Sequence, residues 1–211
     1  MMDLMDFVSG HGLVPVLAVQ EASLAEGLGQ SLVNGGLPIA EVTLRTDCAL
    51  EVIKTMSEID GLLTGAGTVI NGDGAEKVIE AGAKFIVSPA LSAEVSEVCK
   101  KENIPYIPGV ATPRDIQDAI ALGHDVVKFF PAEACGGVKT LKAFAAPYGG
   151  VNFMPTGGIN AGNLSDYLSL PYVKACGGSW LVSKDDLKNR NWTAIEESVK
   201  EAVQLVKSIR G

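Results

Sequence analysis

Short apolar runs recur along the 211-residue chain at nearly even intervals, and this repeat limits the available folds more than any other feature of the sequence. Successive runs begin 21 to 26 residues apart. Segments whose apolar residues follow helical spacing separate them. Eight strand-helix units in succession predict an α/β fold, a (β/α)8 TIM barrel of parallel strands. The runs begin near Leu13, Pro38, Gly61, Ala83, Ile104, Asp125, Val151 and Val173.

Residues typical of helix ends support this division of the chain. Residues 34–36 (Asn-Gly-Gly) predict a helix C-terminus, and residues 112–113 (Thr-Pro) predict an N-cap followed by proline at the first helical position. A capping box at residues 193–196 is expected to start the last helix. We also expect an extra N-terminal helix, from about residue 2 to residue 10, ahead of the first strand.

A doubly wound open sheet would also alternate strands and helices, so it is the main competing architecture. Two observations favour the barrel. Residues 14–20 run from the first strand into a helix without the Gly-x-Gly-x-x-Gly turn of dinucleotide-binding sheets, and eight repeats match the number that closure requires. A chain of 211 residues is at the small end for such a barrel. We therefore expect a single barrel domain over residues 1–211.

The composition is that of a globular protein and argues against several classes of function. Hydrophobic residues make up 47% of the chain and charged residues 20%. The net charge is −8 and no Lys/Arg cluster is present, which disfavours nucleic-acid binding. The first residues lack the positive flank and long apolar core of a signal peptide, and no apolar run approaches a membrane-spanning length. We therefore expect a cytoplasmic protein with neither nucleic-acid nor membrane partners.

The cysteines and histidines do not form a recognisable metal motif. His11 and His124 are far apart in sequence, and neither belongs to a ligand motif such as His-Glu-x-x-His. The cysteines share no Cys-x-x-Cys spacing, which also argues against a disulfide framework. A metal-dependent mechanism would therefore need an all-carboxylate site. The four cysteines, expected as reduced thiols, are Cys48, Cys99, Cys135 and Cys176.

Lys128 lies in a stretch of β-branched and aromatic residues, where burial is expected and a charge is costly. Desolvation disfavours the charged form of an amine, so a buried lysine tends to lose its proton and to attack ketones, forming a Schiff base. The alternative is a lysine at a strand end, whose stem packs while its head reaches water.

Alternation along two of the predicted strands places an amine and a carboxylate on the same side. On the second strand, Glu41, Thr43 and Arg45 share one face, while the intervening positions are apolar and suited to pack against helices. The same count on the sixth strand places Lys128 and Phe130 inward. A structural ion pair between Glu41 and Arg45 is the alternative explanation for these two charges.

Three glycine-containing loops follow predicted strands at the end of the barrel where active sites of this architecture gather. Residues 65–68 (GAGT) let the backbone approach a ligand and end in a hydroxyl, although a tight strand-helix turn would use the same residues. Residues 156–160 (TGGIN) and 177–179 (GGS) place paired glycines ahead of helix starts. Exposed N–H groups at the positive end of a helix dipole would suit a phosphate dianion.

Five motifs fall at these strand ends: EVTLRT at 41–46, GAGTV at 65–69, KFFPAE at 128–133, PTGGI at 155–159 and GGSWLV at 177–182. Together they closely resemble the 2-keto-3-deoxy-6-phosphogluconate (KDPG) aldolase family, whose members are also described as 4-hydroxy-2-oxoglutarate (KHG) aldolases. The resemblance extends from about residue 14 to residue 182.

The resemblance implies a class I aldolase that uses no metal or other cofactor and splits KDPG into pyruvate and glyceraldehyde 3-phosphate. It also allows cleavage of KHG to pyruvate and glyoxylate. The partners would be small molecules, a phosphorylated keto-deoxy sugar acid and pyruvate, and the assembly would be a homotrimer.

The resemblance also assigns roles to individual residues. Lys128 matches the Schiff-base lysine, and Glu41 matches the carboxylate that transfers protons. Arg45 and Thr68 match the groups that hold the pyruvyl carboxylate. Pro89 and Phe130 match residues that wall the reacting centre, and Thr156 matches a residue that contacts the polyol. The residues that match the phosphate site are Gly157, Gly158, Gly178 and Ser179.

Three alternative functions remain open at this stage. A sister aldolase would act on the galactonate epimer, although the Thr156 hydroxyl favours the gluconate form because it can contact the polyol. A phosphate-binding isomerase or epimerase would use Lys128 only to stabilise charge. A non-catalytic phosphosugar-binding protein would bind without releasing pyruvate.

Overall fold

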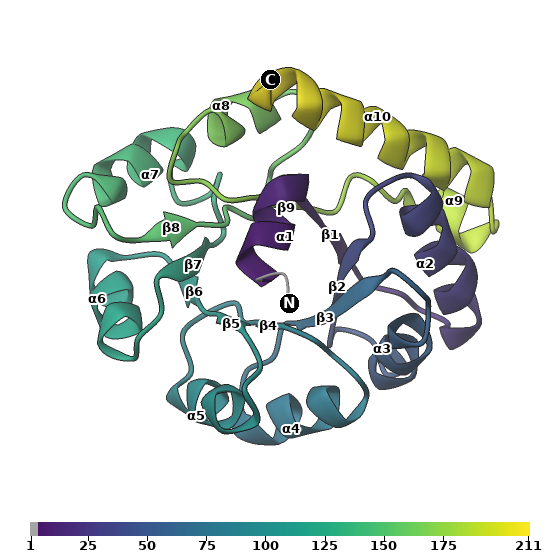
Figure 1. Ribbon diagram of the computed structural model, residues 1–211, viewed down its shortest axis with the longest axis horizontal. Coiled ribbons are helices and arrows are strands. Elements are labelled where there is room, and N and C mark those ends of the chain that lie inside the picture. Colours follow the sequence, from purple (N-terminus) through teal and green to yellow (C-terminus); the bar gives the residue numbers. More distant parts are fainter. Residues whose placement is uncertain (1–3) are drawn as a thin grey trace.

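The computed structural model describes residues 4–211 and shows an α/β fold in which helices surround a ring of parallel strands (Figure 1). The first helix, α1 (Leu4–His11), precedes β1, and in this view it crosses the middle of the ring. Val8 on this helix is fully buried. Residues 2 and 3 of the expected N-terminal helix lie outside the described part of the chain.

Strands form close to every position at which the sequence repeat predicts one. The fifth predicted strand is divided into two short pieces on either side of Pro108, which has no N–H group to donate to a strand ladder. The strands are β1 (Leu13–Leu17), β2 (Ile39–Thr43), β3 (Leu63–Gly67), β4 (Ile86–Val87), β5 (Tyr106–Ile107), β6 (Gly109–Val110), β7 (Val126–Phe129), β8 (Asn152–Phe153) and β9 (Cys176–Gly178).

The strands form two parallel sheets that curl around one axis. The larger sheet has the order β5-β4-β3-β2-β1-β9, and the smaller has the order β6-β7-β8. The two sheets meet at both edges. Pro108 alone separates β5 from β6, and on the other side parallel bridges join Phe153 to Val173 and Thr156 to Gly177. The carboxyl ends of β2 and β7, although in different sheets, therefore point toward the same end of the fold.

Amphipathic helices cover the outside of the strands. Their buried apolar faces pack on the sheets, and the longest, α10, buries Ile195, Val199, Ala202 and Val206 and packs against α2. The helices after α1 are α2 (Ala25–Asn34), α3 (Ala49–Ser57), α4 (Gly72–Glu80), α5 (Ala93–Glu102), α6 (Pro113–Ala121), α7 (Gly137–Ala145), α8 (Leu164–Leu168), α9 (Lys184–Lys188) and α10 (Trp192–Arg210), with a 3-10 turn, η1 (Ala22–Leu24), ahead of α2.

The predicted helix ends are partly confirmed. Helix α2 ends at Asn34, as the Asn-Gly-Gly run predicts. Helix α6 begins after Thr112, whose hydroxyl accepts from the N–H of Asp115 while the Asp115 carboxylate accepts from the N–H of Thr112. The capping box predicted at the start of the last helix is wrong, because α10 already begins at Trp192 with Asn191 as its N-cap.

The C-terminal residue of α10 fastens the last helix to the start of the chain. The Arg210 guanidinium donates to the carbonyls of Val173 at 3.1 Å and Lys174 at 2.8 Å, and also to the carbonyl of Ser9. In the described residues, no helix has both the length and the apolar character that a membrane span requires.

Candidate active site

The central polar contact of the fold joins Lys128 on β7 to Glu41 on β2. Lys128 Nζ lies 3.0 Å from Glu41 Oε1, and the two residues are 5% and 0% exposed. Both side chains lie on the inner face of their strands, as strand alternation predicts. The ammonium also lies 5.3 Å from the centroid of the Phe130 ring, within the range of a cation–π contact. The strand-end alternative, with the lysine head in water, therefore does not describe Lys128.

Gly67, at the end of β3, makes the room that the Glu41 side chain occupies. A Cβ atom at this position would lie 2.2 Å from Glu41 Oε1 and 2.7 Å from Glu41 Cγ. The sequence marked this glycine as a point of ligand approach, whereas in the structure it admits a carboxylate from the neighbouring strand. The other carboxylate oxygen, Glu41 Oε2, is buried and has no hydrogen-bond partner among residues 4–211. One oxygen of Glu41 thus holds the lysine, and the second remains able to accept a proton.

Arg45 follows β2 and is oriented by Thr43. The Thr43 hydroxyl donates to the carbonyl of Leu17 at 2.8 Å, and Arg45 Nε donates to Thr43 Oγ1 at 3.0 Å. Glu41 is paired with Lys128, so the alternative of a structural Glu41–Arg45 ion pair is not what forms. The two Nη groups of Arg45 donate to no protein acceptor in the part of the chain that the structure describes, and a planar guanidinium of this kind can grip a carboxylate.

Thr68, directly after β3, has a left-handed backbone conformation with φ of +60°. A β-branched residue rarely adopts this conformation, and such strained residues concentrate at functional sites. Pro89 follows β4, and its carbonyl packs so closely on Gly109 that a Cβ there would lie 2.1 Å from the oxygen. Ser88, which the sequence did not single out, donates its hydroxyl to the carbonyl of Val69 and joins the loops that carry Thr68 and Pro89.

The loops after β8 and β9 lie side by side. Thr156 is 5% exposed and forms the parallel bridge with Gly177, where a Cβ would lie 2.3 Å from Thr156 Oγ1. Gly157 and Gly158 adopt φ angles of +99° and +82°. Within residues 4–211, the N–H groups of Gly157, Gly158 and Ser179 donate to no protein acceptor. Free amide donors in a glycine loop suit an anion.

The helix dipoles expected beside these loops are not in place. The helices that follow, α8 and α9, begin at Leu164 and Lys184 and contain five residues each. They start several residues beyond the paired glycines, so the expectation of glycines directly ahead of helix starts is wrong. Gly178 instead packs under Trp180, whose ring lies 1.9 Å from the position a Cβ would take. The anion-binding potential of this region therefore comes from backbone N–H groups.

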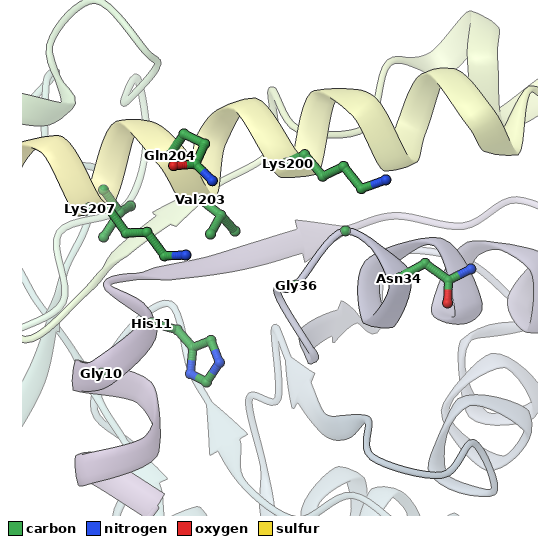
Figure 2. Close-up of a pocket in the computed structure, with 10 residues that line it drawn as sticks. Gly10, His11, Asn34, Gly36, Lys200, Val203, Gln204 and Lys207 are labelled. Atoms are coloured by element: carbon green, nitrogen blue, oxygen red, sulfur yellow. The ribbon is translucent and has the colours of Figure 1, made fainter.

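A separate pocket of about 330 Å³ lies at the opposite end of the strands (Figure 2). It is formed where α1 leads into β1, where α2 leads into β2, and along one side of α10. His11, Asn34, Lys200, Gln204 and Lys207 are among the residues that line it. None of the predicted site residues lines this pocket, because they lie on the strands or at their carboxyl ends, at the other end of the fold.

Comparison with known proteins identifies relatives over nearly the whole chain. The family model described as KDPG and KHG aldolase matches residues 6–198. The KHG/KDPG aldolase of Escherichia coli is 42% identical over 193 residues, which is 91% of each chain. The 2-dehydro-3-deoxy-phosphogluconate aldolase of Haemophilus influenzae is 39% identical over 196 residues, which is 92% of each chain.

Solved structures of similar proteins carry ligands that bear on the chemistry. The KDPG aldolase of Legionella pneumophila, with pyruvate captured as a covalent carbinolamine, superposes with a TM-score of 0.91 at 37% identity, covering 95% of this chain and 98% of the other. The enzyme of Zymomonas mobilis, with 3-phosphoglycerate, superposes with a TM-score of 0.88 at 40% identity, covering 96% of each.

Proposed function

The chain belongs to the KDPG and KHG aldolase family, and we propose that it is a class I aldolase that splits KDPG into pyruvate and glyceraldehyde 3-phosphate. The observation that carries this proposal is the buried contact of 3.0 Å between Lys128 Nζ and Glu41 Oε1. It places a nucleophile and a proton acceptor in one apolar setting, next to loops suited to a carboxylate and a phosphate. A KHG/KDPG aldolase among the relatives supports KHG as a second substrate.

Lys128 begins the reaction by transferring a proton along its hydrogen bond to Glu41. The neutral amine then attacks the keto carbon of the substrate and forms a carbinolamine. Loss of water from the carbinolamine gives an iminium, in which the nitrogen draws electrons from the neighbouring carbon chain. The bond between the third and fourth carbons breaks, and its electron pair moves into the iminium to form an enamine.

Glu41 moves the protons that these steps require. It donates a proton to the departing hydroxyl of the carbinolamine and then takes the proton of the substrate hydroxyl whose carbon becomes the aldehyde. It afterwards returns a proton to the enamine, and water releases pyruvate from Lys128. The Oε2 atom, which is buried and has no hydrogen-bond partner in the described part of the chain, is suited to this exchange because Oε1 is already engaged by the lysine.

Arg45 and Thr68 hold the carboxylate end of the substrate in this proposal. A planar guanidinium can bind both carboxylate oxygens, and this fixes the orientation of the ketone relative to Lys128. Thr43 supports this role, because its hydroxyl holds Arg45 Nε. Pro89 and Phe130 wall the reacting centre, and an apolar wall limits the water that could compete for the iminium.

The loops after β8 and β9 bind the rest of the substrate. Thr156 contacts the polyol, and the phosphate lies on the N–H groups of Gly157, Gly158 and Ser179, with Gly178 between them. Because these atoms are remote from the bond that breaks, their binding energy orients the substrate and selects the phosphorylated form.

The proposal extends to the architecture and assembly of the enzyme. We infer that residues 1–211 form one domain, in which the two curled sheets are parts of a (β/α)8 barrel that follows the N-terminal helix. We also infer a homotrimer, and light scattering of the protein as it leaves a size-exclusion column would test this directly. Four free cysteines suit a reducing compartment, and we place the enzyme in the cytoplasm.

A pyruvate-release assay tests the proposed function. KDPG, its galactonate epimer and KHG are supplied in turn, and pyruvate is measured by a coupled reduction. We expect the highest kcat/KM with KDPG. Preference for the galactonate epimer would assign the sister activity, and the absence of pyruvate with all three would remove the aldolase assignment.

A further inference from the structure

We infer that Glu133 and Tyr167 act as positioning residues, which hold the loop of residues 156–158 in the shape that receives the phosphate of the substrate. This inference rests on the proposed function. Neither residue has a role in the reaction described above. Glu133 ends the lysine-containing motif on the chain that leaves β7, and Tyr167 lies on α8.

Backbone hydrogen bonds first bring this loop against the end of the lysine strand. The N–H of Ala132 donates to the carbonyl of Thr156 at 2.8 Å, and the N–H of Glu133 donates to the carbonyl of Gly157 at 3.1 Å. These bonds fix two carbonyl groups of the loop, and they do not depend on the side chain at position 133. They leave the conformation of Gly158 to be set by other contacts.

The Glu133 side chain supplies the contact at Gly158. A Cβ on Gly158 would lie 2.6 Å from Glu133 Cγ and 2.7 Å from Glu133 Cβ, so this glycine lies directly on the glutamate. Gly137 lies against the carboxylate end of the same glutamate, because a Cβ on Gly137 would lie 2.8 Å from Glu133 Oε1 and 3.1 Å from the Tyr167 hydroxyl. Two glycines with positive φ angles, +82° and +59°, therefore pack against the side chain of Glu133, a residue that remains exposed to solvent.

Tyr167 determines the direction of that carboxylate. Its side chain is fully buried, and its hydroxyl donates to Glu133 Oε1. Burial, followed by the hydrogen bond to Glu133, raises the pKa of the Tyr167 phenol, so the hydroxyl remains a donor throughout the physiological range. The hydrogen bond draws the negative charge toward α8, whereas an unrestrained glutamate beside the glycines would repel a phosphate dianion.

The far side of Gly158 is fixed as well. Asn163 Nδ2 donates to its carbonyl at 3.1 Å, and Asn160 Nδ2 donates to the same oxygen at 3.4 Å. With its carbonyl held by the asparagines and its α-carbon resting on Glu133, the peptide between Gly158 and Ile159 has little freedom to rotate, while the backbone bonds from Ala132 and Glu133 hold the two preceding peptides, which carry the N–H groups of Gly157 and Gly158. The N–H groups of the loop are thereby held in place before substrate arrives, which lowers the cost of binding.

Steady-state kinetics on two substrates test this role. Tyr167→Phe removes the donor, Glu133→Ala removes the acceptor, and Glu133→Gln keeps an oxygen that can accept. We expect kcat/KM for KDPG to fall about tenfold in the first two variants, mainly through a higher KM, since one hydrogen bond is lost. Unphosphorylated KHG should be cleaved within about twofold of wild type, and Glu133→Gln should retain most of the activity on KDPG.

Tyr148→Phe is the matched control, because the Tyr148 hydroxyl donates to the carbonyl of Pro113 at 3.3 Å, away from these loops. Equal losses on KDPG and KHG would reduce the pair to a general structural role and overturn the inference, as would unchanged KDPG kinetics in both Tyr167→Phe and Glu133→Ala. A wild-type enzyme that releases pyruvate from neither substrate would instead overturn the proposed function. Thermal unfolding of each variant shows whether the fold is retained.

Discussion

Lys128 Nζ and Glu41 Oε1 are 3.0 Å apart, although the lysine belongs to the three-stranded sheet and the glutamate to the six-stranded sheet. The contact therefore spans the interior of the fold. Burial of two opposite charges is costly unless they are paired, and the absence of a side chain at Gly67 is what allows the glutamate to reach the lysine. A buried pair of this kind suits a catalytic role better than a stabilising one, and the predictions below follow from this contact.

Reduction with borohydride in the presence of pyruvate should leave a stable adduct on Lys128. The prediction follows from its burial and from its proton acceptor at 3.0 Å. Mass spectrometry of peptides locates the adduct. Lys139→Met, at an exposed position on α7, serves as the control and should still be labelled at Lys128. An adduct found on a different lysine would show that the nucleophile has been misassigned.

Replacement of Glu41 by Gln should lower kcat by about a hundredfold or more, the usual range for loss of a general acid-base group. Glutamine keeps the shape and an oxygen near Lys128, so the fold should persist. Pyruvate release and circular dichroism are measured together. Glu197→Gln on the exposed face of α10 is the matched control. Turnover near the wild-type value would limit Glu41 to a structural role.

The buried pair should lower stability when it is broken and not when it is replaced as a unit. Glu41→Leu alone strands an ammonium in the interior, and we expect the free energy of unfolding to fall by about 3 to 5 kcal/mol. Adding Lys128→Met should restore stability to about the wild-type level or above. Urea unfolding measures both. Losses that simply add in the double variant would contradict coupling between the two side chains.

His124 should make the folded state less stable in mild acid. Its Nε2 atom lies 2.7 Å from Ser96 Oγ, and burial lowers the pKa of its imidazole below the ordinary value of 6.5, an effect that nearby Asp125 partly opposes. The unfolded chain therefore binds more protons as the pH falls below 6.5, and stability decreases. His124→Asn should flatten this part of the pH profile, as measured by urea unfolding. An unchanged slope between wild type and variant would assign the acid sensitivity to other groups.

The sequence predicted the strands well, because parallel strands covered by helices appear as short apolar runs. It also placed Lys128 and Glu41 on inward faces by simple alternation. It also predicted that the two would face the same cavity, and the family resemblance gave them complementary roles, but the direct contact of 3.0 Å between residues 87 positions apart could not be predicted from local sequence. The contact between Glu133 and Tyr167 could not be predicted either, because these residues are also far apart in sequence. Gly67 was assigned to ligand approach because the residues around it in the sequence give no sign that a carboxylate from the neighbouring strand lies beside it.

Helix boundaries near the glycine loops were the weakest part of the prediction. Residues 156–160 were expected to lead directly into a helix, yet α8 begins only at Leu164, after two asparagines that bind the carbonyl of Gly158. Asparagine side chains that bond to nearby backbone compete with helix formation. The start of α10 was displaced in the other direction, where the ring of Trp192 packs on Gly27.

Because the proposed reacting pair is divided between the two sheets, the recovery of activity would also report on folding. Helices depend mainly on local contacts and can form early, whereas the approach of β2 to β7 closes a long loop of chain and is expected to be slow. In a refolding experiment, helical signal should therefore return before pyruvate release does. The time at which activity reappears would mark the moment when the two sheets meet.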